Sequence, residues 1–363
     1  MVKAAAPVLS PRALNRALLA RQMLLERSPM ATADAIGHLV GLQAQVPTDP
    51  YIGLWSRLQD FRPQSLEQLL VDRKAVRIAA MRGTIHLMLA ADALQLRTLT
   101  QPVFDRAFPH TPFGKGSKGV DAAAVVRAAR AAVEANAMTL VELRKILAPR
   151  FPEFDAAHLS YLFHYAAPLV QVPPRGLWSK SSAPKVTTVE HWLGKPVAKR
   201  PAVDKIVLRY LAAFGPASAM DAQSWSGLTK LGPVFEKLRP RLVTFADDGG
   251  RELFDLPEAS RPDADTPAPP RFLPVYDNLT LGFANRDRIA GAKPRKPPAD
   301  NVWVKSFTVD GFIAGFWKEA GGTLTLEPFG AVSKKQTSAL VAEGRRLLAF
   351  LAPDEKHEVA IVA

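Results

Sequence analysis

Two glutamines separated by one alanine, Gln43-Ala44-Gln45, form the most informative short pattern in this 363-residue chain. In an extended segment, side chains two residues apart point to the same face, so both amides would face one cavity. An amide can orient water or a ligand through hydrogen bonds, but it is a poor general base near pH 7. A Gln-x-Gln pair is also typical of ordinary polar turns. Its interpretation therefore depends on the residues around it.

A carboxylate and a tyrosine follow this pair closely. Asp49 is the nearest carboxylate and a rival candidate for a general base. Asp49-Pro50 is also typical of a helix start, with Asp as the N-cap and Pro in the first turn. Tyr51 comes next and is a candidate contact to substrate or DNA.

A second group of candidates lies in the run Arg82-Gly83-Thr84-Ile85-His86-Leu87. His86 titrates in a range suited to acid–base work, but a histidine in a hairpin also serves structural or DNA-contacting roles. Arg82 beside Gly83 suits a phosphate clamp or a solvated surface. Thr84 shares this turn and is a further candidate contact.

Further candidates are spread along the chain. Trp178 and Trp225 could stack on bases, although core packing is the commoner use of tryptophan. The basic runs 285–288 and 334–335 could contact phosphates or form solvated faces. The remaining candidate contacts to substrate or DNA are Asn278, Arg286 and Arg288.

Short helices followed by a hairpin must position the candidate residues at 43–51 and 82–87. Leucines at helical spacing predict a helix over 11–27, and Thr32 can cap a second helix running to about residue 42. Further helices are expected over 49–60 and 65–71. Residues 76–89 have β-character broken at Arg82-Gly83, which predicts a hairpin. Helix, turn, helix and hairpin is the order of a winged helix, a DNA-reading module.

The same order recurs twice. A helix is predicted over 121–136, and the capping box formed by Thr139 and Glu142 predicts the start of a second helix. A third helix is predicted over 156–169, followed by a segment rich in Pro and Gly that runs to 193. A third round has helices from 202, from Ser218 and from 232, then a hairpin over 242–256. These rounds indicate three tandem winged helices, although short helices and hairpins are common enough to coincide.

The C-terminal part is predicted to be rich in strands. Residues 257–271 form a Pro/Asp-rich linker. Alternating runs at 302–307, 312–317 and 323–326 predict a small antiparallel sheet or barrel, closed by a helix over 334–351 and a strand over 358–362. The expected class is α+β, mainly α with β hairpins, with three winged helices around a DNA-sized concavity plus a small β-barrel. The predicted boundaries are 1–120, 121–201, 202–260 and 261–363.

The charge balance favours a polyanionic partner. The chain has 47 Lys+Arg against 34 Asp+Glu, which gives a net charge of +13. Nucleic acid is the commonest partner of so basic a protein, although a solvated basic surface gives the same count. With 48% hydrophobic residues, the chain can bury substantial cores.

The residues that are absent exclude several kinds of chemistry. Without cysteine the chain has no disulfide, Cys-ligated zinc, iron–sulfur cluster or thiol nucleophile. None of its seven histidines lies in an HxxxH or similar pair, so neither a metal nor a cofactor is expected. With no signal-peptide core and no apolar run of membrane-spanning length, we expect no membrane contact and a cytoplasmic protein at the bacterial nucleoid.

Taken together, these motifs make the chain similar to the winged-helix DNA glycosylases of the AlkZ/YcaQ type. The similarity covers nearly the whole chain and rests on residues 14–22, 41–45, 82–87, 169–178, 225–228, 273–278, 282–289 and 309–311. The family's catalytic signature is Gln–apolar–Gln in the AlkZ branch and Gln–apolar–Asp in the YcaQ branch. Gln43-Ala44-Gln45 matches the first, which assigns Gln43 and Gln45 as catalytic.

The resemblance implies a monofunctional DNA glycosylase that excises N7-alkylated purines, including bulky adducts and interstrand crosslinks. The implied partner is damaged double-stranded DNA, and we expect a monomer. Two alternatives remain. A non-enzymatic winged-helix DNA-binding protein or regulator would normally dimerise on paired half-sites, which three winged helices in one chain argue against. An interaction scaffold without a DNA role is disfavoured by the net charge of +13.

Overall fold

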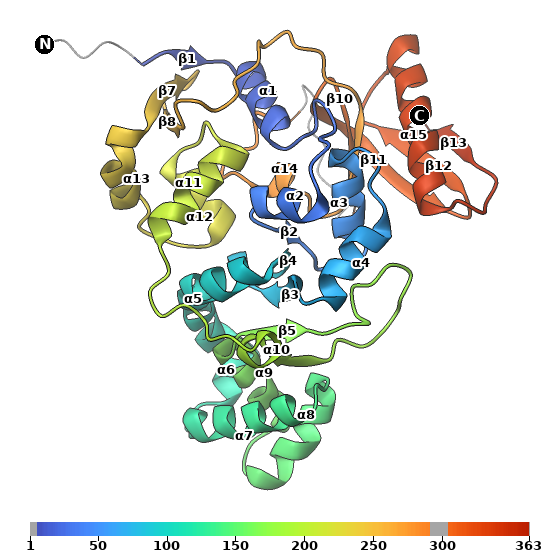
Figure 1. Ribbon diagram of the computed structural model, residues 1–363. Coiled ribbons are helices and arrows are strands. Elements are labelled where there is room, and N and C mark those ends of the chain that lie inside the picture. Colours follow the sequence, from blue (N-terminus) through green and yellow to red (C-terminus); the bar gives the residue numbers. More distant parts are fainter. Residues whose placement is uncertain (1–5, 291–303, 363) are drawn as a thin grey trace, which may run out of the picture.

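The computed structural model describes residues 6–290 and 304–362 (Figure 1). Its elements form the predicted α+β fold, with short helices arranged around three small sheets. No helix within the described residues is both long and apolar enough to cross a membrane.

Residues 6–89 form the predicted helices and hairpin, with the first three helices shorter than expected, the fourth slightly longer, and two short strands that were not predicted. The helix expected over 11–27 ends at Arg21, and the hairpin is divided by a 3-10 turn at Met81–Gly83. Arg82 has a φ of +55° in that turn, a left-handed conformation that few residues adopt. The elements are β1 (Val8–Leu9), α1 (Pro11–Arg21), α2 (Thr32–His38), β2 (Leu42–Gln43), α3 (Asp49–Arg57), α4 (Pro63–Val71), β3 (Ala75–Ala79) and β4 (Ile85–Leu89).

An 18-residue helix, α5 (Ala90–Ala107), follows the hairpin and was not predicted. Pro102 lies inside it, and proline normally interrupts a helical pattern. Arg97 is buried on the same helix as Leu96 and Phe104, so the apolar periodicity is weak. A 3-10 turn (Phe108–His110) and α6 (Pro112–Gly116) complete this segment.

The middle of the chain forms a helical layer at the lower end of Figure 1, joined to the first hairpin by a shared sheet. The capping box is confirmed, because Thr139 and Glu142 exchange hydrogen bonds at the start of the second helix. The elements are α7 (Ala122–Ala135), α8 (Leu140–Leu147), a 3-10 turn (Ala148–Arg150), α9 (Ala156–Ala166), β5 (Leu169–Gln171), β6 (Val186–Thr188) and α10 (Val189–Leu193). Strand β5 pairs with β3, giving the order β2-β4-β3-β5-β6, so this sheet crosses the boundary predicted at residue 120.

The third helical region also has the predicted elements. Ser218 caps the second helix by accepting a hydrogen bond from the backbone of Asp221. The elements are α11 (Val203–Phe214), α12 (Ala219–Ser226), α13 (Gly232–Leu238), a 3-10 turn (Arg239–Arg241), β7 (Val243–Asp247) and β8 (Glu252–Asp255). Strand β1, from the other end of the described chain, pairs with β7 in parallel and makes the sheet β1-β7-β8.

The C-terminal region contains an open sheet, so the predicted barrel is wrong for the described residues. Five strands lie in the order β13-β12-β11-β10-β9, and the two edge strands do not pair with each other. The long helix packs against this sheet (Figure 1). The elements are β9 (Arg271–Leu273), α14 (Asn278–Leu281), β10 (Lys305–Val309), β11 (Phe312–Ala320), β12 (Thr323–Pro328), α15 (Lys334–Leu351) and β13 (Glu358–Ile361). Residues 302 and 303 of the first expected strand lie outside the described residues.

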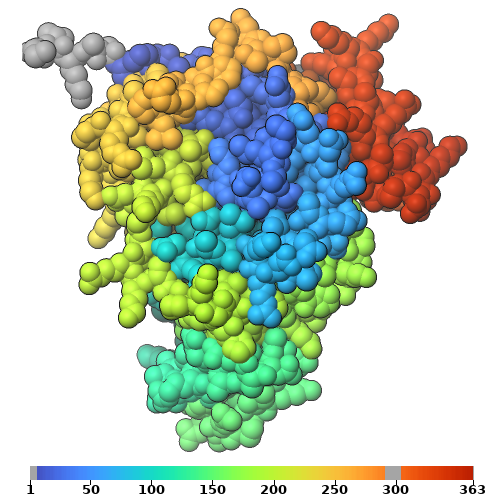
Figure 2. Space-filling view, viewed as in Figure 1, coloured from blue at the N-terminus to red at the C-terminus, as the bar shows by residue number. Residues whose placement is uncertain are grey.

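Buried ion pairs join regions that are far apart in the sequence. Arg57 of α3 pairs with Asp277 at 2.7 Å, and both side chains are fully buried. Arg21 of α1 pairs with Asp255 of β8 at 2.7 Å. Figure 2 shows the N-terminal segments in contact with the yellow and orange segments that follow residue 200. The glutamine motif therefore lies in a part of the fold that is fixed from several sides.

Candidate active site

The two glutamines lie where β2 ends and the chain bends toward α3. Gln43 is paired with His86 of β4 across the sheet and is 6% exposed, whereas Gln45 is exposed. The backbone nitrogen of Ala44 still donates to the Ile85 oxygen at 2.7 Å, so the ladder extends one residue beyond β2. The motif thus has one buried and one exposed amide on the same strand edge.

Both amide oxygens already have donors from the protein. Gln43 Oε1 accepts a hydrogen bond from Arg82 Nη2 at 2.8 Å. Gln45 Oε1 accepts a long one, at 3.4 Å, from the Ile85 backbone nitrogen. A carbonyl oxygen can accept a second hydrogen bond, so a role in orienting water remains available, most readily at the exposed Gln45.

Arg82 is half-buried and bonds to groups inside the protein, so its role as a phosphate clamp stays a prediction. Besides Gln43, its guanidinium donates to the carbonyl oxygen of Trp225 at the end of α12. Burial, with a contribution from nearby Arg286, lowers the pKa of Arg82 to about 10, so the group stays charged at neutral pH. Arg82 therefore connects the hairpin to the third helical region beside Gln43.

His86 is buried and neutral, so the acid–base role considered for it finds no support. Burial and the charge of Arg82 lower the pKa of His86 to about 3. Its Nδ1 lies 2.9 Å from the carbonyl oxygen of Thr84 and donates to it in the neutral ring, which leaves Nε2 as an acceptor 3.4 Å from Arg82. Thr84 is half-buried and bonds through its hydroxyl to the Met81 oxygen.

Asp49 is the first residue of α3 and makes no capping hydrogen bond, so its assignment as an N-cap is wrong. The side chain is 1% exposed, and its carboxyl group lies close to the backbone of Val275 and Tyr276, which favours the charged form. Burial raises its pKa to about 7, and Lys305 of β10 opposes this rise. The carboxyl group is thus closed to solvent in this structure, and its role as a general base stays a prediction.

The aromatic candidates pack inside the protein. Tyr51 is buried and donates through its hydroxyl to the Gly176 oxygen at 2.8 Å. Half-buried Trp178 lies 5.0 Å from the Tyr51 ring and 5.1 Å from that of Phe350. Trp225 is 3% exposed and belongs to the hydrophobic core. Core packing therefore accounts for the burial of the whole Trp225 side chain and of much of the Trp178 side chain.

Only one of the three later polar candidates is exposed. Asn278 donates through Nδ2 to the oxygen of Gly41, two residues before Gln43, at 3.0 Å. Arg288 is buried and donates to the Pro216 oxygen at 2.7 Å, so it is not placed for phosphate contact. Arg286 is exposed and lies near enough to Arg82 to lower its pKa, so it remains a candidate for binding DNA.

Arg77 of β3 is a site residue that the sequence analysis missed. Its Nη2 donates to the carbonyl oxygen of Ala44 at 2.8 Å, and Nη2 and Nε contact Gln171 Oε1 at 3.2 and 3.3 Å. Gly176, with a φ of +92°, lies against it, where a Cβ would be 2.3 Å from Arg77 Cδ. An arginine in a strand carries no sequence signal for this role, but the adjacent Gly176 is a clue to close packing.

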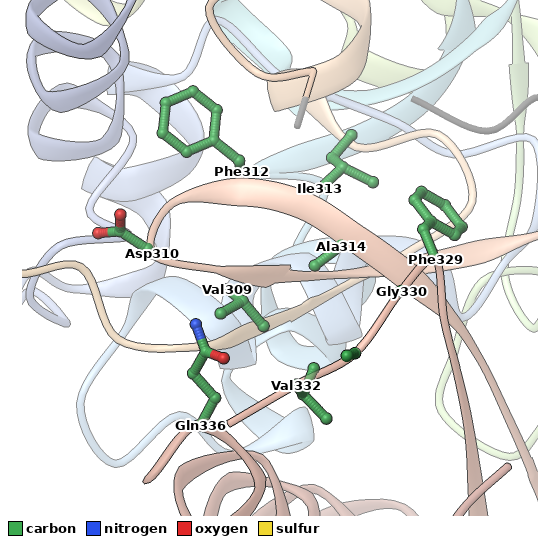
Figure 3. A pocket seen from close by; sticks show the side chains of 10 residues that line it. Val309, Asp310, Phe312, Ile313, Ala314, Phe329, Gly330, Val332 and Gln336 are labelled. Carbon is green, nitrogen blue, oxygen red and sulfur yellow. The ribbon is translucent and has the colours of Figure 1, made fainter. Parts of the chain in front are cut away.

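The site has no acidic or histidine cluster suited to a metal within the described ranges. A surface pocket of about 410 Å³ lies elsewhere, on the open C-terminal sheet between β11 and the start of α15 (Figure 3). It is lined mainly by apolar residues such as Phe312 and Phe329, and none of the candidate site residues lines it.

Comparisons with known proteins agree with this fold. A sequence model described as DNA glycosylase AlkZ-like matches residues 36–350. The chain is 26% identical over 349 residues to a Streptomyces sahachiroi protein named interstrand DNA cross-link repair glycosylase, covering 89% of this chain and 91% of that protein. The structure of Streptomyces sahachiroi DNA glycosylase AlkZ shares the fold, with a TM-score of 0.73 and 20% identity over 98% of this chain and 100% of that one. The resemblance seen in the sequence is confirmed, and the chain belongs to the AlkZ-like DNA glycosylase family.

Proposed function

We propose that this protein is a monofunctional DNA glycosylase that hydrolyses the N-glycosidic bond of N7-alkylated purines, including bulky adducts and interstrand crosslinks. The observation that carries the proposal is the position of Gln43 at the end of β2 and of Gln45 just beyond it, both beside β4, in a member of a DNA glycosylase family. The name of the Streptomyces sahachiroi relative supports crosslinked DNA as a substrate.

Neutral amides suffice for this reaction because the substrate is already activated. An N7-alkylated purine is cationic, so it leaves without prior protonation. The C1′–N9 bond breaks with its electron pair moving to the purine, and the sugar passes through an oxocarbenium-like state. Water then bonds to C1′ and releases a proton to solvent. Groups held in place by the protein can orient this water without reorganisation. An unmodified purine is neutral and would not leave with this help alone.

The mechanism uses water rather than an amine. A lyase reaction requires a lysine with a lowered pKa that forms a Schiff base with the sugar. No lysine occurs between Gly41 and Tyr51. Burial lowers the pKa of Lys305, which lies near Asp49, but its amine packs 4.6 Å from the centroid of the buried Trp317 ring. Borohydride trapping is therefore expected to give no covalent protein–DNA product, and the product strand breaks only after alkaline treatment.

Duplex DNA is the proposed partner, and we infer that one copy of the chain acts alone in the cytoplasm, at the nucleoid. The net charge of +13 supports binding to the phosphate backbone. Exposed Arg286, near the guanidinium of Arg82, is a candidate phosphate contact. Such an enzyme would meet damaged DNA by electrostatic attraction before any base is examined.

A gel assay for abasic sites tests the proposal. Duplex DNA carrying one N7-methylguanine and a duplex with an N7-linked interstrand crosslink are incubated with the protein and then treated with alkali. We expect strand breaks at the methylated position and separation of the crosslinked strands. Binding to both duplexes without base release would show that the protein is a binder and would overturn the proposal.

A further inference from the structure

Arg82 connects acceptors from two parts of the chain. Its Nη2 donates to Gln43 Oε1 at 2.8 Å and lies 3.4 Å from His86 Nε2, while Nη1 donates to the Trp225 oxygen. Gly227, which follows α12, packs on the main chain of Arg82, where an added Cβ would lie 3.1 Å from both its N and Cα atoms. The guanidinium is therefore fixed in both position and direction.

This arrangement determines which end of the Gln43 amide faces the protein. A guanidinium donates hydrogen bonds and accepts none, so only the oxygen of Gln43 can face Arg82. Neutral His86 offers Nε2 to the same guanidinium as a second acceptor and does not compete as a donor. Gln43 Nε2 forms no hydrogen bond with any residue in the described part of the chain. Its two hydrogens are free to donate to a bound group.

We propose that Arg82 is a positioning residue that turns the Gln43 amide so that its Nε2 group faces the DNA, which makes Gln43 a hydrogen-bond donor to the departing purine. The inference rests on the proposed function. As the glycosidic bond breaks, the purine gains electron density and its ring nitrogens become stronger acceptors. A fixed donor therefore strengthens its bond in the transition state. Gln45, which is exposed and only weakly bonded, is left to orient the water.

The Gln43→Glu variant separates the two hydrogen-bonding roles of this side chain, donation through Nε2 and acceptance through Oε1. Glutamate has the same shape and keeps an oxygen for Arg82, but it has no amide hydrogen. We expect the single-turnover excision of N7-methylguanine from duplex DNA to slow at least about tenfold, because loss of one placed donor commonly costs more than that. Retention of more than about a third of the wild-type rate would overturn the proposal. A wild-type protein that releases no base would instead refute the proposed function.

Arg82→Met tests whether Arg82 acts through position or through contact with phosphate. A positioning role lowers the maximal single-turnover rate at least about tenfold and changes the half-saturating protein concentration little. A phosphate contact would raise that concentration and reduce the salt slope of binding by about one, with the maximal rate preserved. The second result would overturn the proposal. Arg82→Lys should behave like Met, since lysine keeps the charge but cannot form the same fork.

Arg97→Met is the matched control, because Arg97 is another buried arginine that bonds to a glutamine oxygen, that of Gln101, and to backbone carbonyls. It should change thermal stability but not the maximal excision rate of the folded fraction.

The Gln43→Ala/Arg82→Met double variant should be no slower than the slower single variant, because Arg82 acts through Gln43. Losses that multiply would show an independent role for Arg82 and contradict the proposal.

Discussion

At the residue scale, two arginines hold the Gln-Ala-Gln motif. Arg82 bonds to the side chain of Gln43, and Arg77 bonds to the main chain at Ala44. Both of these hydrogen bonds go to neutral oxygens. The sequence pointed to the two glutamines as candidate catalytic residues, which stays a prediction. It did not show that Arg77 and Arg82 hold them, because no local pattern tells that an arginine in a hairpin turns inward. Burial in the complete fold decides their direction.

Asp49 should make the protein less stable as the pH rises toward neutrality. Its pKa is about 7 in the folded state, against 3.8 for an unperturbed aspartate. The folded protein therefore binds this proton more tightly than the unfolded chain. The stabilisation from this bound proton is therefore complete below about pH 4. Between pH 4 and pH 7 it is lost, and the free energy of unfolding falls by up to about 4 kcal/mol.

Asp49→Asn removes this dependence, because asparagine does not ionise. In urea denaturation, the variant should be more stable than the wild type at pH 8, and the difference should shrink or reverse at pH 5. An equal difference at both pH values would show that Asp49 does not titrate with a raised pKa.

At the element scale, elements with local start and stop signals were predictable. The capping box at Thr139 and the helix start at Asp49-Pro50 both mark observed helices. Helix α5 was missed because Pro102 lies within it and its buried face includes Arg97. The open C-terminal sheet was predicted as a barrel because alternation along strands does not reveal whether the two edges pair.

The loop after β5 should support the glutamine motif through Arg77. Gly176→Ala would place a methyl group 2.3 Å from Arg77 Cδ at a φ of +92°. We expect a loss of stability of more than about 2 kcal/mol, and a slower excision rate because Arg77 releases the Ala44 oxygen.

Gly119→Ala is the control for the backbone contribution. Gly119 has a φ of +90°, and an added Cβ would have no heavy atom within 4 Å. Its substitution should cost only about 1 kcal/mol and leave excision unchanged. Equal effects of the two substitutions on melting and on excision would disprove the packing argument.

At the scale of the whole molecule, long-range contacts fix the site. The sheet that carries Gln43 includes strands from both sides of residue 120, and the buried Arg57–Asp277 pair ties α3 to the C-terminal region. The family and the α+β class could be predicted from the sequence. The pairing of β3 with β5 could not, because strands more than 90 residues apart carry no local signal for each other. The four predicted domain ranges stay a prediction.

Binding to undamaged duplex DNA should be mainly electrostatic. The net charge of +13 predicts several phosphate contacts, so the logarithm of the binding constant should fall linearly with the logarithm of salt concentration. With about six contacts the slope is near −5. Fluorescence anisotropy between 50 and 200 mM salt measures it, and a slope near zero would favour a scaffold without a DNA role.

The most direct test of the central claim is the release of free N7-methylguanine from duplex DNA, measured by mass spectrometry in excess EDTA. We predict that the wild-type protein releases the base and that Gln43→Ala/Gln45→Ala slows release at least a hundredfold, a loss typical of removing placed groups, with folding and DNA affinity retained. Full release by the double variant, or release by the wild type only after a metal is restored, would contradict the account.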